Sequence, residues 1–124
     1  MTDNQDLLEF VREHVRSVWG VELLLLLKSD PGRRWTAPEL VRELRASTTL
    51  VNDNLQRFER SGLVTAEEPS RYRYDPAGAV LSELCDRLEA AYRVRPVSVI
   101  NMIATAPNPL QTLADAFKFR GDDT

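Results

Sequence analysis

The chain has 124 residues, 43% of them hydrophobic and 28% charged, which is the size and composition of one ordinary globular domain. Its net charge of −3 argues against a simple nucleic-acid binder, because nucleic-acid affinity comes largely from cations on phosphates. A single cysteine excludes an internal disulfide, and the acidic start shows no signal-peptide pattern, so we expect a cytoplasmic protein.

The first part of the chain predicts two helices. Residues 5–16 carry an apolar helical face, and Ser17 is placed to cap the helix that follows. This second helix contains the apolar run Leu23–Leu27, which is too short to span a bilayer and indicates a buried segment. We assign Trp19 to the core, although a pocket between the first helices and the C-terminal part would suit an effector.

A turn and a third helix come next. Residues 29–32 have strong turn composition, and 33–35 are expected to be extended and to pair with a later hairpin. Thr36 and Glu39 have the spacing of a capping box, and Pro38 falls in the first turn, where a missing N–H is tolerated. The pattern therefore predicts a well-capped helix that begins near Thr36.

A fourth helix follows after a short turn. The hydroxyls of residues 47–49 can cap its start, and Gly62 supplies the left-handed residue that ends helices. Residues at i, i+4 and i+7 form its core side, and polar residues occupy the other side. The core positions are Val51, Leu55 and Phe58.

A β-hairpin is predicted directly after this helix. An apolar strand begins at Leu63 and Val64, and Pro69 and Ser70 mark a turn. Residues 71–74 alternate arginine with tyrosine, as a strand with two different faces should. We expect the tyrosines to pack under the hairpin.

Helices resume after Pro76. We expect one helix over 79–93, a short one from Pro96 and a last one over 108–117, which divides the chain into 1–76 and a helical extension, 77–124. These helices either form a dimer interface or fold back and complete the core of the monomer. The apolar positions of the first are Val80, Leu81, Leu84, Cys85, Leu88 and Tyr92, and those of the second are Val99, Ile100 and Ile103.

The order of elements from Ser17 to Pro76 is a helix-turn-helix with a hairpin behind it. It resembles the MarR-like and related bacterial winged-helix regulators. The expected fold is mainly α with a small β-hairpin, a winged helix-turn-helix with additional N- and C-terminal helices. The resemblance implies a transcriptional regulator that binds double-stranded DNA as a homodimer, with the fourth helix in the major groove.

Side-chain chemistry selects the residues expected to contact DNA. Asparagine and glutamine can pair with adenine, arginine with guanine, and threonine can touch a thymine methyl group or a phosphate. Arginines outside the groove are expected to contact the DNA backbone. The groove candidates are Thr48, Thr49, Asn52, Gln56 and Arg57, and the backbone candidates are Arg71, Arg73, Arg33, Arg34 and Arg60.

Charge supports two interpretations of this region. Residues 28–76 hold nine lysines and arginines and eight acidic residues, which gives this region a net charge of +1. The rest of the chain holds seven cations and eleven acidic residues, a net charge of −4. Asp53, however, places a carboxylate on the proposed groove face, where it would repel phosphate. The alternative is therefore a winged-helix protein–protein interaction module without DNA binding. In the hairpin, Glu67 and Glu68 can instead form cross-strand salt bridges with the arginines.

Other chemistry has little basis in the sequence. Cys85 on an apolar stripe indicates a buried thiol, and His14, the only histidine, indicates a surface or core-edge residue. The chain has no nucleophile elbow, glycine-rich phosphate loop, histidine pair or cysteine pair. We therefore expect no enzymatic activity, no cofactor and no metal. A small-molecule or protein effector remains open, and no residue set identifies it.

Overall fold

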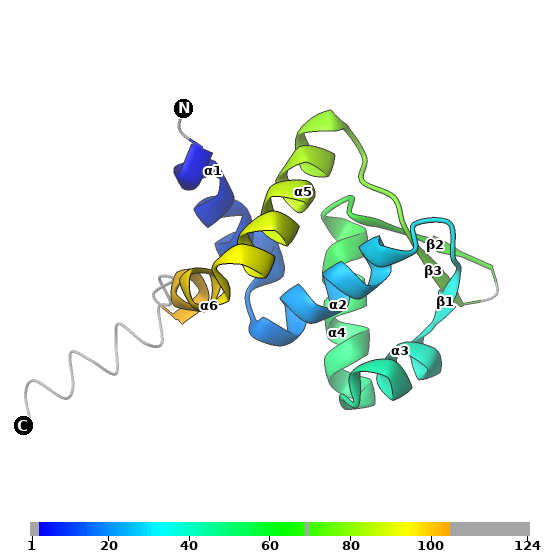
Figure 1. Ribbon diagram of the computed structural model, residues 1–124. Helices are drawn as coiled ribbons and strands as arrows, with labels where there is room; N and C mark the ends of the chain where they lie inside the picture. The colour runs from blue at the N-terminus through cyan, green and yellow to red at the C-terminus, as the bar shows by residue number, and fades with distance from the viewer. Residues whose placement is uncertain (1–2, 69, 105–124) are drawn as a thin grey trace, which may run out of the picture.

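Helices and three short strands follow one another along the part of the chain that the computed structural model describes, residues 3–68 and 70–104. The fold is mainly α with a small antiparallel sheet, which confirms the predicted class (Figure 1). The helix expected over 108–117 lies outside the described residues, as does Pro69. The elements are α1 (Asp3–Phe10), η1 (Val11–Val15), α2 (Val18–Ser29), β1 (Trp35–Thr36), α3 (Ala37–Leu44), α4 (Thr48–Arg60), β2 (Val64–Glu67), β3 (Arg71–Tyr74), α5 (Ala79–Val94) and α6 (Pro96–Ala104).

The sheet has the strand order β1-β3-β2, and both pairings are antiparallel. The predicted pairing of the extended piece with the hairpin is confirmed, since Trp35 lies opposite Tyr72. The strand is shorter than the expected piece, and Arg33 and Arg34 lie outside it. It ends at Thr36 because that residue is already the N-cap of α3.

The N-terminal segment differs from the single helix predicted over 5–16. An α-helix, α1, continues into a π-helical turn, η1, in which the Arg16 N–H donates to the Val11 carbonyl at 2.7 Å. Arg16 then adopts a left-handed conformation (φ 72°) that ends the segment. The end of η1 lies very close to α2, where a Cβ on Gly20 would be 2.3 Å from the Val15 carbonyl oxygen. Glycine is therefore required at this approach.

The predicted helix ends are confirmed where side chains cap them. The Ser17 hydroxyl accepts a hydrogen bond from the Gly20 N–H at 2.9 Å at the start of α2. Thr36 and Glu39 form the complete capping box of α3. The Ser47 hydroxyl caps α4. These local bonds satisfy backbone donors that would otherwise lack a helical partner.

One hydrophobic cluster joins α1, η1, α2, α3, α4, the sheet, α5 and α6. Trp19 does not belong to it, although it was expected in the core: 41% of its surface is exposed, because it lies in the first turn of α2, next to Val18, which is also exposed. Val80 and Ile100, two of the predicted apolar positions, also lie outside the core of the monomer and are 70% and 39% exposed. Cys85 is fully buried, as predicted.

Helix α5 packs against α1, far from it in sequence, and helps to close the core (Figure 1). It is also tied to α2, because the Lys28 ammonium lies 2.6 Å from Glu89 and 3.0 Å from Asp86. The inner side of the apolar stripe predicted for α5 therefore packs within the monomer. No helix in the described ranges is long and apolar enough to cross a membrane.

Candidate nucleic-acid interface

Helix α4 has an apolar face and a polar face. Val51, Leu55 and Phe58 are fully buried, as predicted. Since the helix turns about 100° per residue, the side chains opposite these three form one continuous polar stripe. Its exposed members are Thr48, Thr49, Asp53, Gln56, Glu59 and Arg60, and Asn52 is half-buried.

Asp53 lies in the middle of the polar stripe. It is exposed, with Thr49 one turn before it and Gln56 and Arg60 one and two turns after it. A carboxylate here can accept a hydrogen bond from a cytosine amine but repels phosphate. The stripe therefore offers hydrogen-bonding groups with little positive charge.

The side chain of Arg57 turns away from the polar stripe toward the end of η1. Its Nε donates to the His14 carbonyl at 3.1 Å, and its Nη2 donates to the Val15 carbonyl at 3.1 Å. Burial is the main cause that lowers the pKa of this guanidinium. Because Nε and Nη2 are held by these backbone carbonyls, the guanidinium of Arg57 is directed away from the side of α4 that was expected to contact bases.

Asn54 is a structural residue that the sequence interpretation missed. It is the buried polar residue among those that the structure describes, with 4% of its surface exposed. Its Nδ2 donates to the Leu50 carbonyl at 2.8 Å, and its Oδ1 accepts from Arg57. Its position between Val51 and Leu55 on the inner side of α4 is the sequence signal that could have identified it.

A second contact, besides that of Arg57, joins η1 to the end of α4. His14 Nδ1 and the Ser61 hydroxyl lie 2.8 Å apart, at the C-terminal end of α4. His14 is half-buried, which confirms its expected place at the edge of the core. Together with Arg57, it fixes the C-terminal half of α4 on η1.

In the hairpin, Glu67 neutralises two of the predicted phosphate contacts. Its carboxylate pairs with Arg34 and, at 2.9 Å, with Arg73, which also lies 3.7 Å from Asp75. The hydrogen bonds from Arg34 and Arg73 hold the pKa of Glu67 below its ordinary value. The salt-bridge alternative is thus confirmed for Arg73. Arg71 has no such ion pair in the described chain, and its Nη1 donates to the Arg34 carbonyl at 3.4 Å.

Arg33 is engaged close to the sheet. Its guanidinium lies 3.6 Å from the centre of the Trp35 ring, and its Nη2 is 4.0 Å from a Glu39 oxygen. A guanidinium stacked on an aromatic face keeps its charge, and this one remains exposed. Arg33 can therefore still contribute positive charge, although its position is fixed.

Three exposed arginines without an ion pair in the described residues lie on α3, on α4 and in the turn between them. Arg60 was expected; Arg42 and Arg45 were not. Arg45 caps α3 in a left-handed conformation (φ 56°), in the turn just before α4. The signal for Arg42 was its place outside the apolar face of α3. These cations lie near the polar stripe in sequence and are available to an anionic partner.

Comparison of the chain with protein-family models, with curated proteins and with solved structures finds no match. Within the described residues, no three histidine, cysteine or acidic side chains are grouped to hold a metal ion. What the site can do therefore follows from its geometry: it can form hydrogen bonds along α4 and attract anions at the neighbouring arginines.

Proposed function

We propose that this chain is a winged helix-turn-helix transcriptional regulator that binds double-stranded DNA through the polar stripe of α4. The observation that carries the proposal is the order of elements. Strand β1 lies between α2 and α3 in the chain, α4 follows α3, and the β2-β3 hairpin follows α4 and pairs with β1 through β3 (Figure 1). Residues 45–47 form a three-residue turn between α3 and α4, which is the usual length in a helix-turn-helix.

In this proposal α4 enters the major groove. Exposed side chains of the polar stripe meet base edges, and arginines at either side meet phosphates. Arg34 and Arg73 contribute less than expected because Glu67 pairs with both. The proposed base contacts are Thr48, Thr49, Asn52 and Gln56, and the proposed phosphate contacts are Arg42, Arg45, Arg60 and Arg71.

Selection of bound duplexes from a random-sequence library tests this assignment. Gln56→Ala should change which sequences are selected, because a base contact carries sequence information. Arg60→Ala should weaken binding to all sequences similarly and leave the preference intact, since a phosphate contact carries none. If Gln56→Ala selects the same sequences as the wild-type protein, α4 does not read bases.

A protein-interaction module is the second candidate, and two observations favour it. Asp53 occupies the middle of the polar stripe, and Glu67 pairs with two arginines of the β-sheet region. Both lower the attraction for phosphate. Under this alternative, the protein would select no duplex from the library, and both variants would behave like the wild-type protein.

We further propose that the regulator acts as a homodimer, as in the MarR-like proteins that the sequence resembles. Helix α6 supports this, because Val97 and Ile100, one turn apart, expose 66% and 39% of their surfaces. Val94, just before α6, exposes 71%. Two copies related by a twofold axis could cover these side chains and place two α4 helices about 34 Å apart, one turn of DNA.

A further inference from the structure

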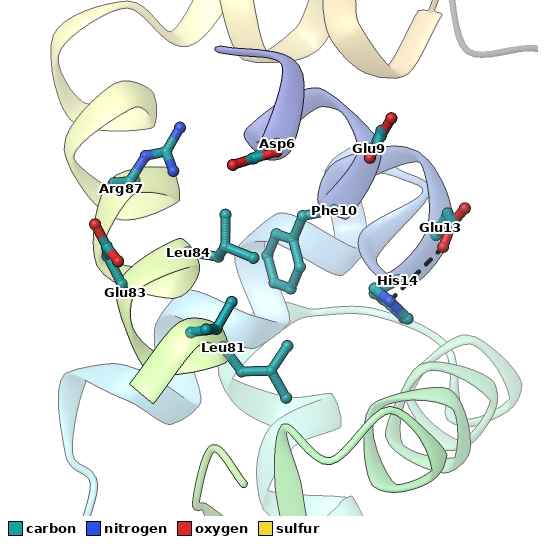
Figure 2. A pocket seen from close by; sticks show the side chains of 10 residues that line it. Asp6, Glu9, Phe10, Glu13, His14, Leu81, Glu83, Leu84 and Arg87 are labelled. Atoms are coloured by element: carbon teal, nitrogen blue, oxygen red, sulfur yellow. Dashed lines mark ion pairs between the residues drawn. The ribbon is translucent and has the colours of Figure 1, made fainter. Parts of the chain in front are cut away.

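A cleft lies between the N-terminal helices and α5. Its volume is about 440 Å³, within the range of small-molecule sites. Phe10 of α1 and Leu81 and Leu84 of α5 form an apolar floor, as Figure 2 shows. Val80, 70% exposed, extends this apolar surface at the start of α5. The cleft is thus suited to a ligand with a substantial apolar body.

The rim of the cleft is acidic on both sides. α1 and η1 contribute Asp6, Glu9 and Glu13, and α5 contributes Glu83 (Figure 2). The other charged lining residue is Arg87, so four carboxylates against one guanidinium give a net charge of −3 with His14 neutral. The four carboxylate residues are exposed. An anionic ligand is therefore disfavoured, and a cation is attracted.

We propose that this cleft binds an amphipathic organic cation, such as a quaternary ammonium or phosphonium compound with aromatic or alkyl groups. The apolar floor takes the hydrocarbon body, and the carboxylates surround the positive centre. Phe10 is only 3% exposed, so the carboxylates rather than its ring would hold the positive centre. A bare metal ion would leave the floor unused, and the described residues offer it no group of three ligands.

The cleft is connected to α4 through η1. Glu13 and His14 line the cleft, while the carbonyls of His14 and Val15 hold Arg57. π-helical turns are frequent at functional sites. This one carries two residues that line the cleft, and Arg57 of α4 binds its backbone carbonyls. A ligand that displaces His14 from Ser61 would change the support of α4. This regulatory consequence rests on the proposed DNA binding, whereas ligand binding itself does not.

Isothermal titration of the full chain with tetraphenylphosphonium tests the cleft, with tetraphenylborate, of the same shape and opposite charge, as the control. We expect saturable binding of one phosphonium per chain and no saturable binding of the borate. Glu13→Gln and Glu83→Gln should each weaken binding roughly two- to fivefold, as expected for exposed charges. Glu43→Gln on α3, outside the cleft, should leave it unchanged. No saturable phosphonium binding, equal binding of the borate, or unchanged affinity in a variant that combines Glu13→Gln and Glu83→Gln would overturn the proposal.

A second titration separates this proposal from the proposed function. Duplex DNA affinity is measured with and without saturating tetraphenylphosphonium, and the Glu13→Gln/Glu83→Gln double variant controls for direct effects of the cation on DNA. We expect wild-type affinity to change at least threefold and the double variant to respond less. Phosphonium binding without DNA binding would overturn the proposed function but support the proposal that the cleft binds an organic cation. DNA binding that is insensitive to bound phosphonium would overturn the coupling to α4.

Discussion

Arg57 and Arg60 lie one turn apart on α4 and have opposite surroundings. Arg57 donates to two backbone carbonyls of η1, whereas Arg60 is exposed on the polar stripe. Arg57→Ala should lower the free energy of unfolding by roughly 2–3 kcal/mol, because it leaves two carbonyls without a charged donor. Urea denaturation measures this.

Arg60→Ala is the matched control and should change the unfolding free energy by less than about 0.5 kcal/mol. An Arg57→Ala protein as stable as the Arg60→Ala protein would show that the η1 contacts contribute nothing to stability. In that case Arg57 would again be available as a DNA contact.

Cys85 is fully buried on the inner side of α5, and burial raises the pKa of its thiol. We expect native protein to react slowly with a thiol reagent, because the reactive thiolate is disfavoured. Cys85→Ser should lower stability by about 1–3 kcal/mol, since burying a hydroxyl costs more than burying a thiol, even beside the Tyr74 hydroxyl. Rapid labelling of native protein would contradict this and favour a redox role.

The same thiol gives a pH dependence with a definite sign. In the folded protein the pKa of the thiol is raised above its ordinary value of 9.0, which applies to the unfolded chain. The contribution of the thiol to the free energy of unfolding is therefore fully present below pH 9.0. Its contribution is lost as the pH rises toward the folded pKa, because only the unfolded chain releases the proton. Stability measured between neutral pH and alkaline pH should fall less steeply in Cys85→Ala than in the wild-type protein.

At the scale of elements, the contact between η1 and α2 depends on one glycine. A methyl group on Gly20 would be 2.3 Å from the Val15 carbonyl oxygen, and the backbone would have to move. Gly20→Ala should therefore lower the unfolding free energy by about 1–3 kcal/mol, the usual cost of overpacking. Gly32→Ala, where a Cβ meets no atom within 4 Å, is the control. Equal thermal stability of the two variants would refute this interpretation of η1.

The helix ends could be predicted from the sequence because their causes are local. The capping box of Thr36 and Glu39 and the cap at Ser47 involve residues only three positions apart. The π-helical turn could not be predicted, because it depends on the approach of η1 to Gly20 in another helix. A periodic apolar pattern alone predicts an uninterrupted helix there.

In the candidate site, too, features with local causes could be predicted from the sequence and features with distant partners could not. Spacing alone was enough to place Thr49 and Gln56 on the side opposite the core. It could not place Arg57, which lies between the two faces and whose carbonyl partners are 42 and 43 positions away. Glu67 was expected to oppose the hairpin arginines, but its additional pairing with Arg34 depends on how β1 meets the hairpin.

At the scale of the whole molecule, charge is the feature that most constrains the proposed function. The net charge is −3, and the acidic cleft lies on α1, η1 and α5, elements outside the proposed DNA-binding face. Five exposed arginines (Arg33, Arg34, Arg42, Arg45 and Arg60) lie on or beside β1, α3 and α4, and three others in the described residues, Arg16, Arg93 and Arg95, lie elsewhere. This separation of charge permits local attraction to DNA in an acidic protein, and it predicts binding that is weak and sensitive to salt.

Fluorescence anisotropy of the full chain against labelled genomic duplex fragments, at about 50 mM and 200 mM salt, tests the central claim most directly. We predict binding at the lower salt concentration and a marked loss of affinity at the higher one, because phosphate contacts release counterions. Absence of binding to any fragment at the lower salt concentration would contradict the claim and favour the protein-interaction module.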